Sequence, residues 1–162
     1  MRGRAGRALT DPATLVATGF GLGFASVMPG TWASLAALPC AWLIRDRLGV
    51  LALAIATLAA LLAGWWAAAR TVKASRAADP GWIVIDEIAG QWLVLLATPL
   101  DWRWYAAAFV LFRGFDIWKP FPVSWADRNI PGGFGIMLDD VAAAIYALLV
   151  IAIGEGVLGV RP

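Results

Sequence analysis

Residues 48–69 read LGVLALAIATLAALLAGWWAAA, and this stretch decides the fold class. It carries no charged side chain over a length that matches the roughly 17–25 apolar residues of a bilayer-crossing helix. Trp65 and Trp66 stand near its end, where an interfacial aromatic belt is expected. We therefore predict a transmembrane helix over residues 48–69.

The composition of the whole chain agrees with a membrane protein. Of its 162 residues, 61% are hydrophobic and 15% are charged, and the mean hydropathy is +0.75. Soluble domains have about 45–50% apolar and about 25% charged residues. One small core cannot hide this apolar excess, because a domain of about 150 residues buries only about 70% of its unfolded surface. Lipid is the solvent that such a composition favours.

The missing residue types limit the chemistry. The chain has no histidine, which is the most common general base and metal ligand, and its single cysteine, Cys40, cannot form an intramolecular disulfide. The net charge is only +2, and the basic residues stand singly between apolar runs rather than on one basic face. We therefore expect no nucleic-acid partner. Catalysis would depend on carboxylates, hydroxyls, Lys and Arg.

Four further apolar segments flank the central one, at residues 31–44, 82–100, 105–118 and 141–154. The first is interrupted by Pro39 and reaches spanning length only if residues 26–30 contribute. Together the segments predict an all-α, polytopic membrane bundle of about five spans. We divide the chain into an N-terminal tail (1–14), one helical membrane domain (15–154) and a C-terminal tail (155–162).

A glycine-rich stretch precedes the first span. Gly19, Gly21 and Gly23 lead into Pro29, Gly30 and Thr31. Small residues allow helices to pack closely in membranes, whereas an irregular loop would present backbone N–H groups to an anion. Both alternatives stay open, and we expect an interfacial or re-entrant segment here.

Basic residues orient the bundle, because Lys and Arg concentrate in cytoplasmic loops. They lie in the tail (Arg2, Arg4, Arg7) and in the loop after the central span (Arg70, Lys73, Arg76). This placement leaves Arg45 and Arg47 on the outer side, with Asp46 between them. It also brings the start of span one and five carboxylates to the same cytoplasmic level. These carboxylates are Asp86, Glu87, Asp116, Asp139 and Asp140.

Carboxylates at membrane depth cost about 2.5–3.5 kcal/mol each, and several at one depth repel one another. A divalent cation is the simplest way to hold them together. Mg2+ fits best, because it prefers oxygen ligands and is often held by one or two carboxylates together with a substrate phosphate. Arg113 lies three residues before Asp116 and so shares its helix face, while Lys119 and Arg128 follow nearby.

Each of these features also has an ordinary structural explanation. Arg113 and Asp116 could form an intrahelical ion pair, and Lys119 could extend from a helix end to the interface. Asp139 and Asp140 could stand in a helix first turn, where the dipole favours acids. Asp86 and Glu87 could be an interfacial pair that faces water. Their agreement in depth favours a site.

Four ordered sequence blocks resemble the phosphatidylglycerophosphatase A family. They are GFGLG (19–23) leading to PGT (29–31), VIDEIAG (84–90), FRGFDIWKP (112–120), and DRN (127–129) followed by GGFGIMLDD (132–140). The resemblance covers residues 15 to about 153. The visible departures are conservative, such as Ile85 where an aromatic residue is common.

The resemblance implies an all-helical, Mg2+-dependent lipid phosphatase of the bacterial inner membrane, with its site on the cytoplasmic side. Such an enzyme removes the terminal phosphate of phosphatidylglycerophosphate to give phosphatidylglycerol. Carried over, the catalytic residues are Asp86, Glu87, Asp116, Asp139 and Asp140, with Asp86, Glu87, Asp139 and Asp140 as metal ligands. The substrate-side candidates are Thr31, Arg113, Lys119 and Arg128.

The chemical route stays open at the level of sequence. Water could attack phosphorus directly, or Asp116 or Asp86 could form a covalent aspartyl-phosphate. The rival function is a small transporter or ion pathway, since carboxylates at membrane depth also mark proton relays and cation paths. The oligomeric state is not fixed by any of these patterns.

Overall fold

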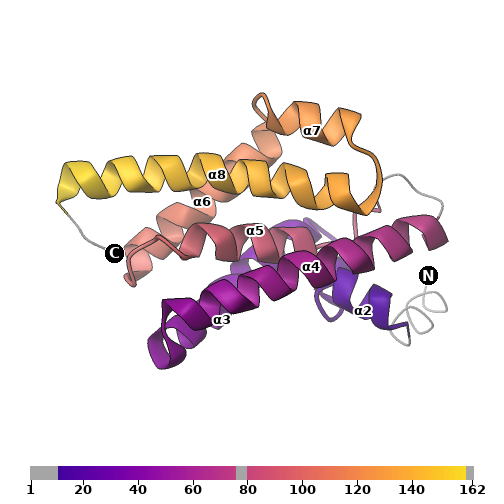
Figure 1. The fold of residues 1–162 in the computed structure, drawn as a ribbon, viewed down its shortest axis with the longest axis horizontal. Helices are drawn as coiled ribbons and strands as arrows, with labels where there is room; N and C mark the ends of the chain where they lie inside the picture. The colour runs from indigo at the N-terminus through magenta and orange to yellow at the C-terminus, as the bar shows by residue number, and fades with distance from the viewer. Residues whose placement is uncertain (1–10, 76–79, 160–162) are drawn as a thin grey trace.

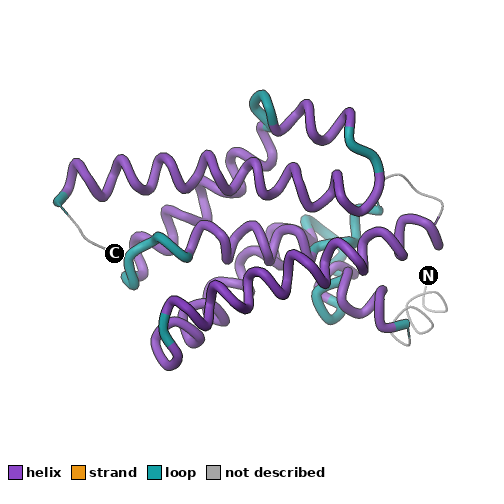
Figure 2. The backbone as a smooth tube through the Cα atoms, in the orientation of Figure 1, coloured by secondary structure: helices purple, strands orange, loops and turns teal. Residues whose placement is uncertain are grey.

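A computed structural model describes residues 11–75 and 80–159, and these residues form helices and loops without a strand (Figures 1 and 2). This confirms the predicted all-α class. The elements are α2 (Pro12–Ala17), η1 (Leu22–Phe24), α3 (Pro29–Leu48), α4 (Val50–Ser75), α5 (Ile85–Leu95), α6 (Trp102–Trp118), α7 (Val123–Asn129) and α8 (Gly132–Leu158). The basic residues Arg2, Arg4, Arg7 and Arg76 lie outside the described ranges.

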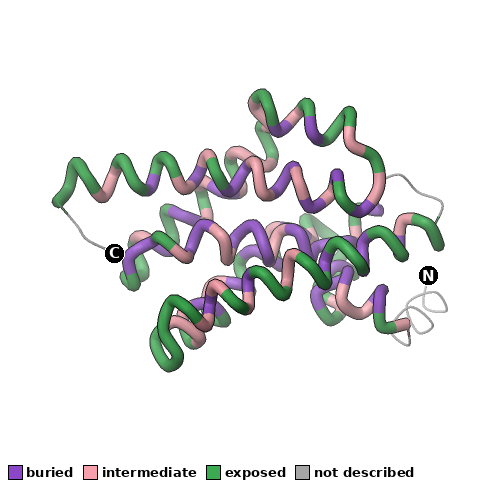
Figure 3. Tube along the Cα trace, in the orientation of Figure 1, coloured by how far each residue is buried: buried purple, intermediate pink, exposed green. Residues whose placement is uncertain are grey.

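Two helices, α4 and α8, are long and apolar enough to cross a membrane. Only 28% of the most apolar stretch of either helix is buried, unlike a core helix of a soluble protein, and Figure 3 shows their exposed outer faces. The span predicted over residues 48–69 corresponds to α4, which begins two residues later, at Val50, and continues to Ser75. Arg70 and Lys73 extend the helix rather than starting a loop, because cations are favourable near a helix C-terminus.

The five-span arrangement is not confirmed. Helix α5 has 11 residues and α6 has 17, where the sequence predicted spans over 82–100 and 105–118. At 1.5 Å per residue, α5 is only about 16 Å long, against a hydrocarbon core of about 30 Å. Figure 3 shows α5 as the most buried of the long elements, so its apolar residues pack against protein.

Helix α8 begins nine residues earlier than the predicted apolar run at 141–154. It starts at Gly132, directly after Pro131, and so places Asp139 and Asp140 well inside the helix rather than in its first turn. Gly133 allows this start, because a Cβ there would meet the backbone of Ala69 on α4. The explanation of Asp139 and Asp140 as acids favoured by the helix dipole therefore fails.

Contacts at successive levels show how α3, α5 and α6 pack together. Gly30 on α3 lies against Glu87 on α5, and the Trp92 indole N–H donates to the Ala37 carbonyl at 2.9 Å. Helices α3 and α5 thus run side by side in the same direction. Gly90 on α5 faces Phe112 on α6, which returns the opposite way. The starts of α3 and α5 and the end of α6 consequently meet.

Arg45 holds the other end of α5. Its guanidinium donates to the Leu95 carbonyl at 2.9 Å and to the Thr98 carbonyl. A cation at a helix C-terminus compensates carbonyls that lack partners within the helix. Arg45, which the predicted topology left on the outer side, therefore has a structural function.

Replacing this guanidinium tests its role in stability. Arg45→Met is expected to lower the free energy of unfolding by about 2 kcal/mol, because hydrogen bonds to charged groups contribute about 1.5–3 kcal/mol. Thermal unfolding in detergent measures the change. Arg47→Met is the control, since Arg47 is exposed and its ion pair within the described residues is with the exposed Asp46, and surface pairs contribute about 0–1 kcal/mol. Equal effects of the two substitutions would contradict the assignment.

Candidate active site

The acidic side chains gather where α3 and α5 begin, α6 ends and α8 passes beside them. Asp86 and Glu87 stand in the first turn of α5, and Asp140 lies on α8. Each of these three offers a carboxylate oxygen, and the three oxygens lie within 4.8 Å of one another. Three of the four predicted metal ligands therefore lie together, whereas Asp139 is not part of this trio, and their role as ligands stays a prediction.

Asp86 and Asp140 are buried, Glu87 is partly buried, and all three are incompletely bonded. Asp86 is 9% exposed and Asp140 is 3% exposed. Among the described residues, Asp86 Oδ1, Glu87 Oε2 and Asp140 Oδ2 have no hydrogen-bond partner. Buried polar atoms are almost always bonded, so three such oxygens in one place require an explanation. A bound cation would supply it.

Arg113 is the cation nearest to this trio. Its Nη1 lies 2.6 Å from Asp116 Oδ2 and 3.7 Å from Glu87 Oε1. The i,i+3 pair expected from sequence is therefore present, yet it also reaches across to α5, so it is more than an intrahelical pair. The Arg113 Nε has no partner within the described part of the chain. This buried N–H thus lacks the acceptor that an anion could provide.

Asp139 points to a different cation. Lys119 Nζ donates to Asp139 Oδ2 at 2.7 Å and to Asp127 Oδ1 at 2.5 Å. Although partial burial lowers the pKa of Lys119, its bonds with Asp127 and Asp139 raise that pKa above its ordinary value. Lys119 therefore ties the end of α6 to α7 and α8 through its two ion pairs. Asp127 was not selected from sequence, although it belongs to the DRN block at 127–129.

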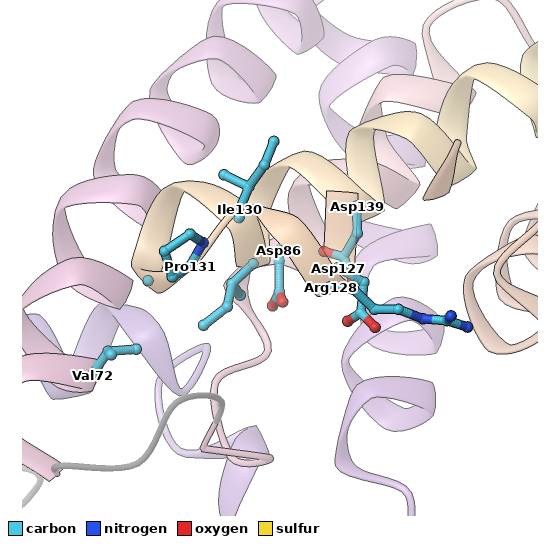
Figure 4. A pocket seen from close by; sticks show the side chains of 10 residues that line it. Val72, Asp86, Asp127, Arg128, Ile130, Pro131 and Asp139 are labelled. Atoms are coloured by element: carbon cyan, nitrogen blue, oxygen red, sulfur yellow. The ribbon is translucent and has the colours of Figure 1, made fainter. Parts of the chain in front are cut away.

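A cavity of about 560 Å³ opens beside the carboxylates. It lies between the end of α4, the start of α5 and the connection from α7 to α8, and Asp86, Asp127, Arg128 and Asp139 are among its lining residues (Figure 4). The Asp86 carboxylate projects into the middle of this view, whereas the guanidinium of Arg128 extends away from it. Arg128 therefore borders the cavity without contacting the trio.

The start of α3 closes the other side of the site. A Cβ on Gly30 would overlap the Glu87 carboxylate and lie 2.7 Å from its Cδ, so only glycine permits this approach. The neighbouring Thr31 has a buried Oγ1 without a hydrogen-bond partner among the residues described. Thr31 thus lies next to the α3–α5 contact, and its role in substrate binding stays a prediction.

The donor set fits Mg2+. The three clustered ligand atoms are carboxylate oxygens, the donors that Mg2+ prefers, and each of the three residues has a carboxylate oxygen without a partner in the described ranges. Sequence reasoning overlooked one further polar group here, the fully buried Gln91 on α5. Its only signal was that it is the single polar residue in the apolar run 88–97.

Comparison with known proteins gives the family. Residues 15–155 match the family model for phosphatidylglycerophosphatase A. The chain is 41% identical to phosphatidylglycerophosphatase A of Escherichia coli K12 over 140 residues, covering 86% of this chain and 81% of that one. It is 45% identical over 144 residues to the protein of that name from Haemophilus influenzae, covering 88% of each chain.

A third relative carries a different name. It is a Bacteroides thetaiotaomicron protein named "Putative phosphatidylinositol-3-phosphatase", 41% identical over 153 residues, covering 90% of this chain and 94% of that one. No solved structure matches the chain. Because the family model covers most of the chain and two relatives share its name, the chain belongs to the phosphatidylglycerophosphatase A family of lipid phosphatases.

Proposed function

We propose that this chain hydrolyses the terminal phosphate monoester of phosphatidylglycerophosphate, releasing phosphatidylglycerol and inorganic phosphate, and that it requires Mg2+. The observation that carries the proposal is the trio of Asp86, Glu87 and Asp140 with unpartnered oxygens beside Arg113. Family membership supplies the lipid substrate. No observation on the described residues favours the transporter alternative.

Asp86, Glu87 and Asp140 would hold the metal in this proposal. Bound Mg2+ supplies Lewis acidity that polarises the phosphoryl oxygens and lowers the pKa of a bound water. Asp139 is assigned a supporting role, because its carboxylate already accepts a hydrogen bond from Lys119. Its oxygen Oδ1 also accepts from the Asp140 backbone N–H at 3.1 Å, which fixes the two residues relative to each other.

Arg113 would bind the phosphate of the substrate. Asp116 holds its guanidinium from one side, and the partnerless Nε leaves N–H donors for phosphate oxygens. Charge-assisted bonds of this kind are short and strong, and they stabilise charge that develops on the equatorial oxygens during phosphoryl transfer. Thr31 and Lys119 would contribute further donors at the edges of the site, and Arg128 would attract the headgroup at the cavity mouth.

We also propose that the chain is a polytopic bundle in the bacterial inner membrane with the acidic end on the cytoplasmic side. Arg70 and Lys73 lie at the end of α4, and Gly133 beside Ala69 places that end next to the start of α8. Basic residues therefore accompany the acidic end, as the positive-inside rule requires. Helices α3, α5 and α6 would complete the bundle around the two long spans.

Phosphate release from purified protein tests the function. Phosphatidylglycerophosphate in mixed micelles should release phosphate only when Mg2+ is present. Glu87→Gln and Asp140→Asn should each lower the rate by about 100-fold or more, since changing a group that only supports a metal ligand already costs about 10–100-fold. Asp46→Asn, at the exposed far end of α3, is the matched control and should keep full activity. Cation flux across liposomes without phosphate release would favour the transporter instead.

The close approach of α3 to Glu87 gives a second prediction. Gly30→Ala should displace the Glu87 carboxylate and lower the rate by about 100-fold, the cost of moving a reacting group by about 1 Å. Gly114→Ala is the control, because a Cβ at Gly114 meets no atom within 4 Å although it adjoins Arg113. A wild-type kcat for Gly30→Ala would contradict the assignment of Glu87 to the active site.

Acid quenching separates the two chemical routes. We propose that water attacks phosphorus directly. Protein quenched with acid while it turns over substrate labelled in the terminal phosphate should then carry no labelled phosphate. Label bound to Asp86 or Asp116 as an acyl phosphate would replace this route with a covalent one. Mass spectrometry of the quenched peptides identifies the residue.

A further inference from the structure

Gln91 on α5 is a fully buried amide without a hydrogen-bond partner in the described part of the chain. Its side chain is 0% exposed, and among the described residues neither its amide nitrogen nor its amide oxygen has a hydrogen-bond partner. The buried hydroxyls of Ser34, Thr57 and Thr98, in contrast, each donate to the carbonyl one turn earlier. An unpaired buried amide destabilises a protein, and an apolar side chain of similar size would not.

The position of Gln91 relates it to the acidic trio. It lies four residues after Glu87 on α5, so the two side chains are neighbours on one helix face. Side chains on an α-helix lean toward its N-terminus, which directs the Gln91 amide toward Glu87. The next residues on this side, Val94 and Leu95, are fully buried and apolar. Gln91 therefore separates the site from the hydrophobic core.

Glu87 has an atom that matches this donor. Its Oε1 lies 3.7 Å from Arg113, which is long for a direct hydrogen bond, and its Oε2 has no partner in the part of the chain described. Neither the contact with Arg113 nor a hydrogen bond at Oε2 therefore fixes the orientation of this carboxylate. A donor from the adjacent turn would select one orientation.

We propose that Gln91 is a positioning residue for Glu87. Its amide N–H group donates to Glu87 Oε2 and thereby directs Oε1 toward the cluster formed with Asp86 and Asp140. The inference rests on the proposed function of that cluster. Without ligand the amide stays unpaired, which lowers the stability of the protein. When the site is filled, the same amide orders the Glu87 carboxylate.

Gln91→Met tests the proposal, because Met has a similar size and shape without the amide. Three results are expected: a higher Tm without Mg2+, a smaller rise of Tm when Mg2+ is added, and a kcat about tenfold lower with the KM for lipid changed less than about twofold. Gln91→Glu keeps the shape but replaces the donor by an acceptor, so it should lose at least as much kcat. Thr57→Val is the control for a buried polar group with a partner, and it should lower Tm and leave kcat unchanged.

The outcomes separate this inference from the function. An unchanged kcat for Gln91→Met would overturn the inference, whatever its Tm. If the Tm is also lower, the role of Gln91 is purely structural. If the wild-type protein releases no phosphate, the proposed function fails. The rise of Tm caused by Mg2+ then tests the positioning role without an activity assay. An equal rise in wild type and Gln91→Met would overturn that role.

Discussion

Electrostatic repulsion among buried carboxylates is the constraint around which this molecule is organised. Asp86, Glu87 and Asp140 cluster together, and Arg113 lies beside this cluster, where it pairs with Asp116 and approaches Glu87. Buried like charges are costly, and removing a partner from such a cluster costs more than the cluster itself contributes. A divalent cation would neutralise the carboxylates, and a substrate phosphate would bind Arg113, so the two together would balance the charges of the site.

The helices position these charges by close backbone contact. Gly30 brings α3 against Glu87, Gly90 brings α6 and α8 against α5, and Gly133 brings α8 against α4. Small residues serve this purpose in membrane bundles, where packing rather than water exclusion drives helix association. Arg45 and Lys119 fix the two ends, the first by capping α5 and the second by joining α6 to α7 and α8. The site is thus held by backbone shape and by charge together.

Hydrophobic pattern predicted the class of fold and the helix α4, because an uncharged run of this length is typical of a helix that crosses a bilayer. The topology inferred from Lys and Arg likewise predicted that Asp86, Glu87 and Asp140 lie at one level, although Asp140 stands inside α8 rather than at its start. The start of α8 was placed too late, because Gly132 and Gly133 resemble a helix breaker until the contact with Ala69 is known. Asp139 contacts Lys119, whereas its neighbour Asp140 joins Asp86 and Glu87. The two side chains point in different directions from α8, and the sequence alone does not reveal those directions.

The most direct measurement is the position of the metal. A crystal structure of the protein with Mn2+ in place of Mg2+ would locate the ion by its anomalous scattering. The account predicts a peak between the carboxylates of Asp86, Glu87 and Asp140. A peak between Asp127 and Asp139 with Lys119 displaced, or no peak within reach of the trio at saturating Mn2+, would contradict it.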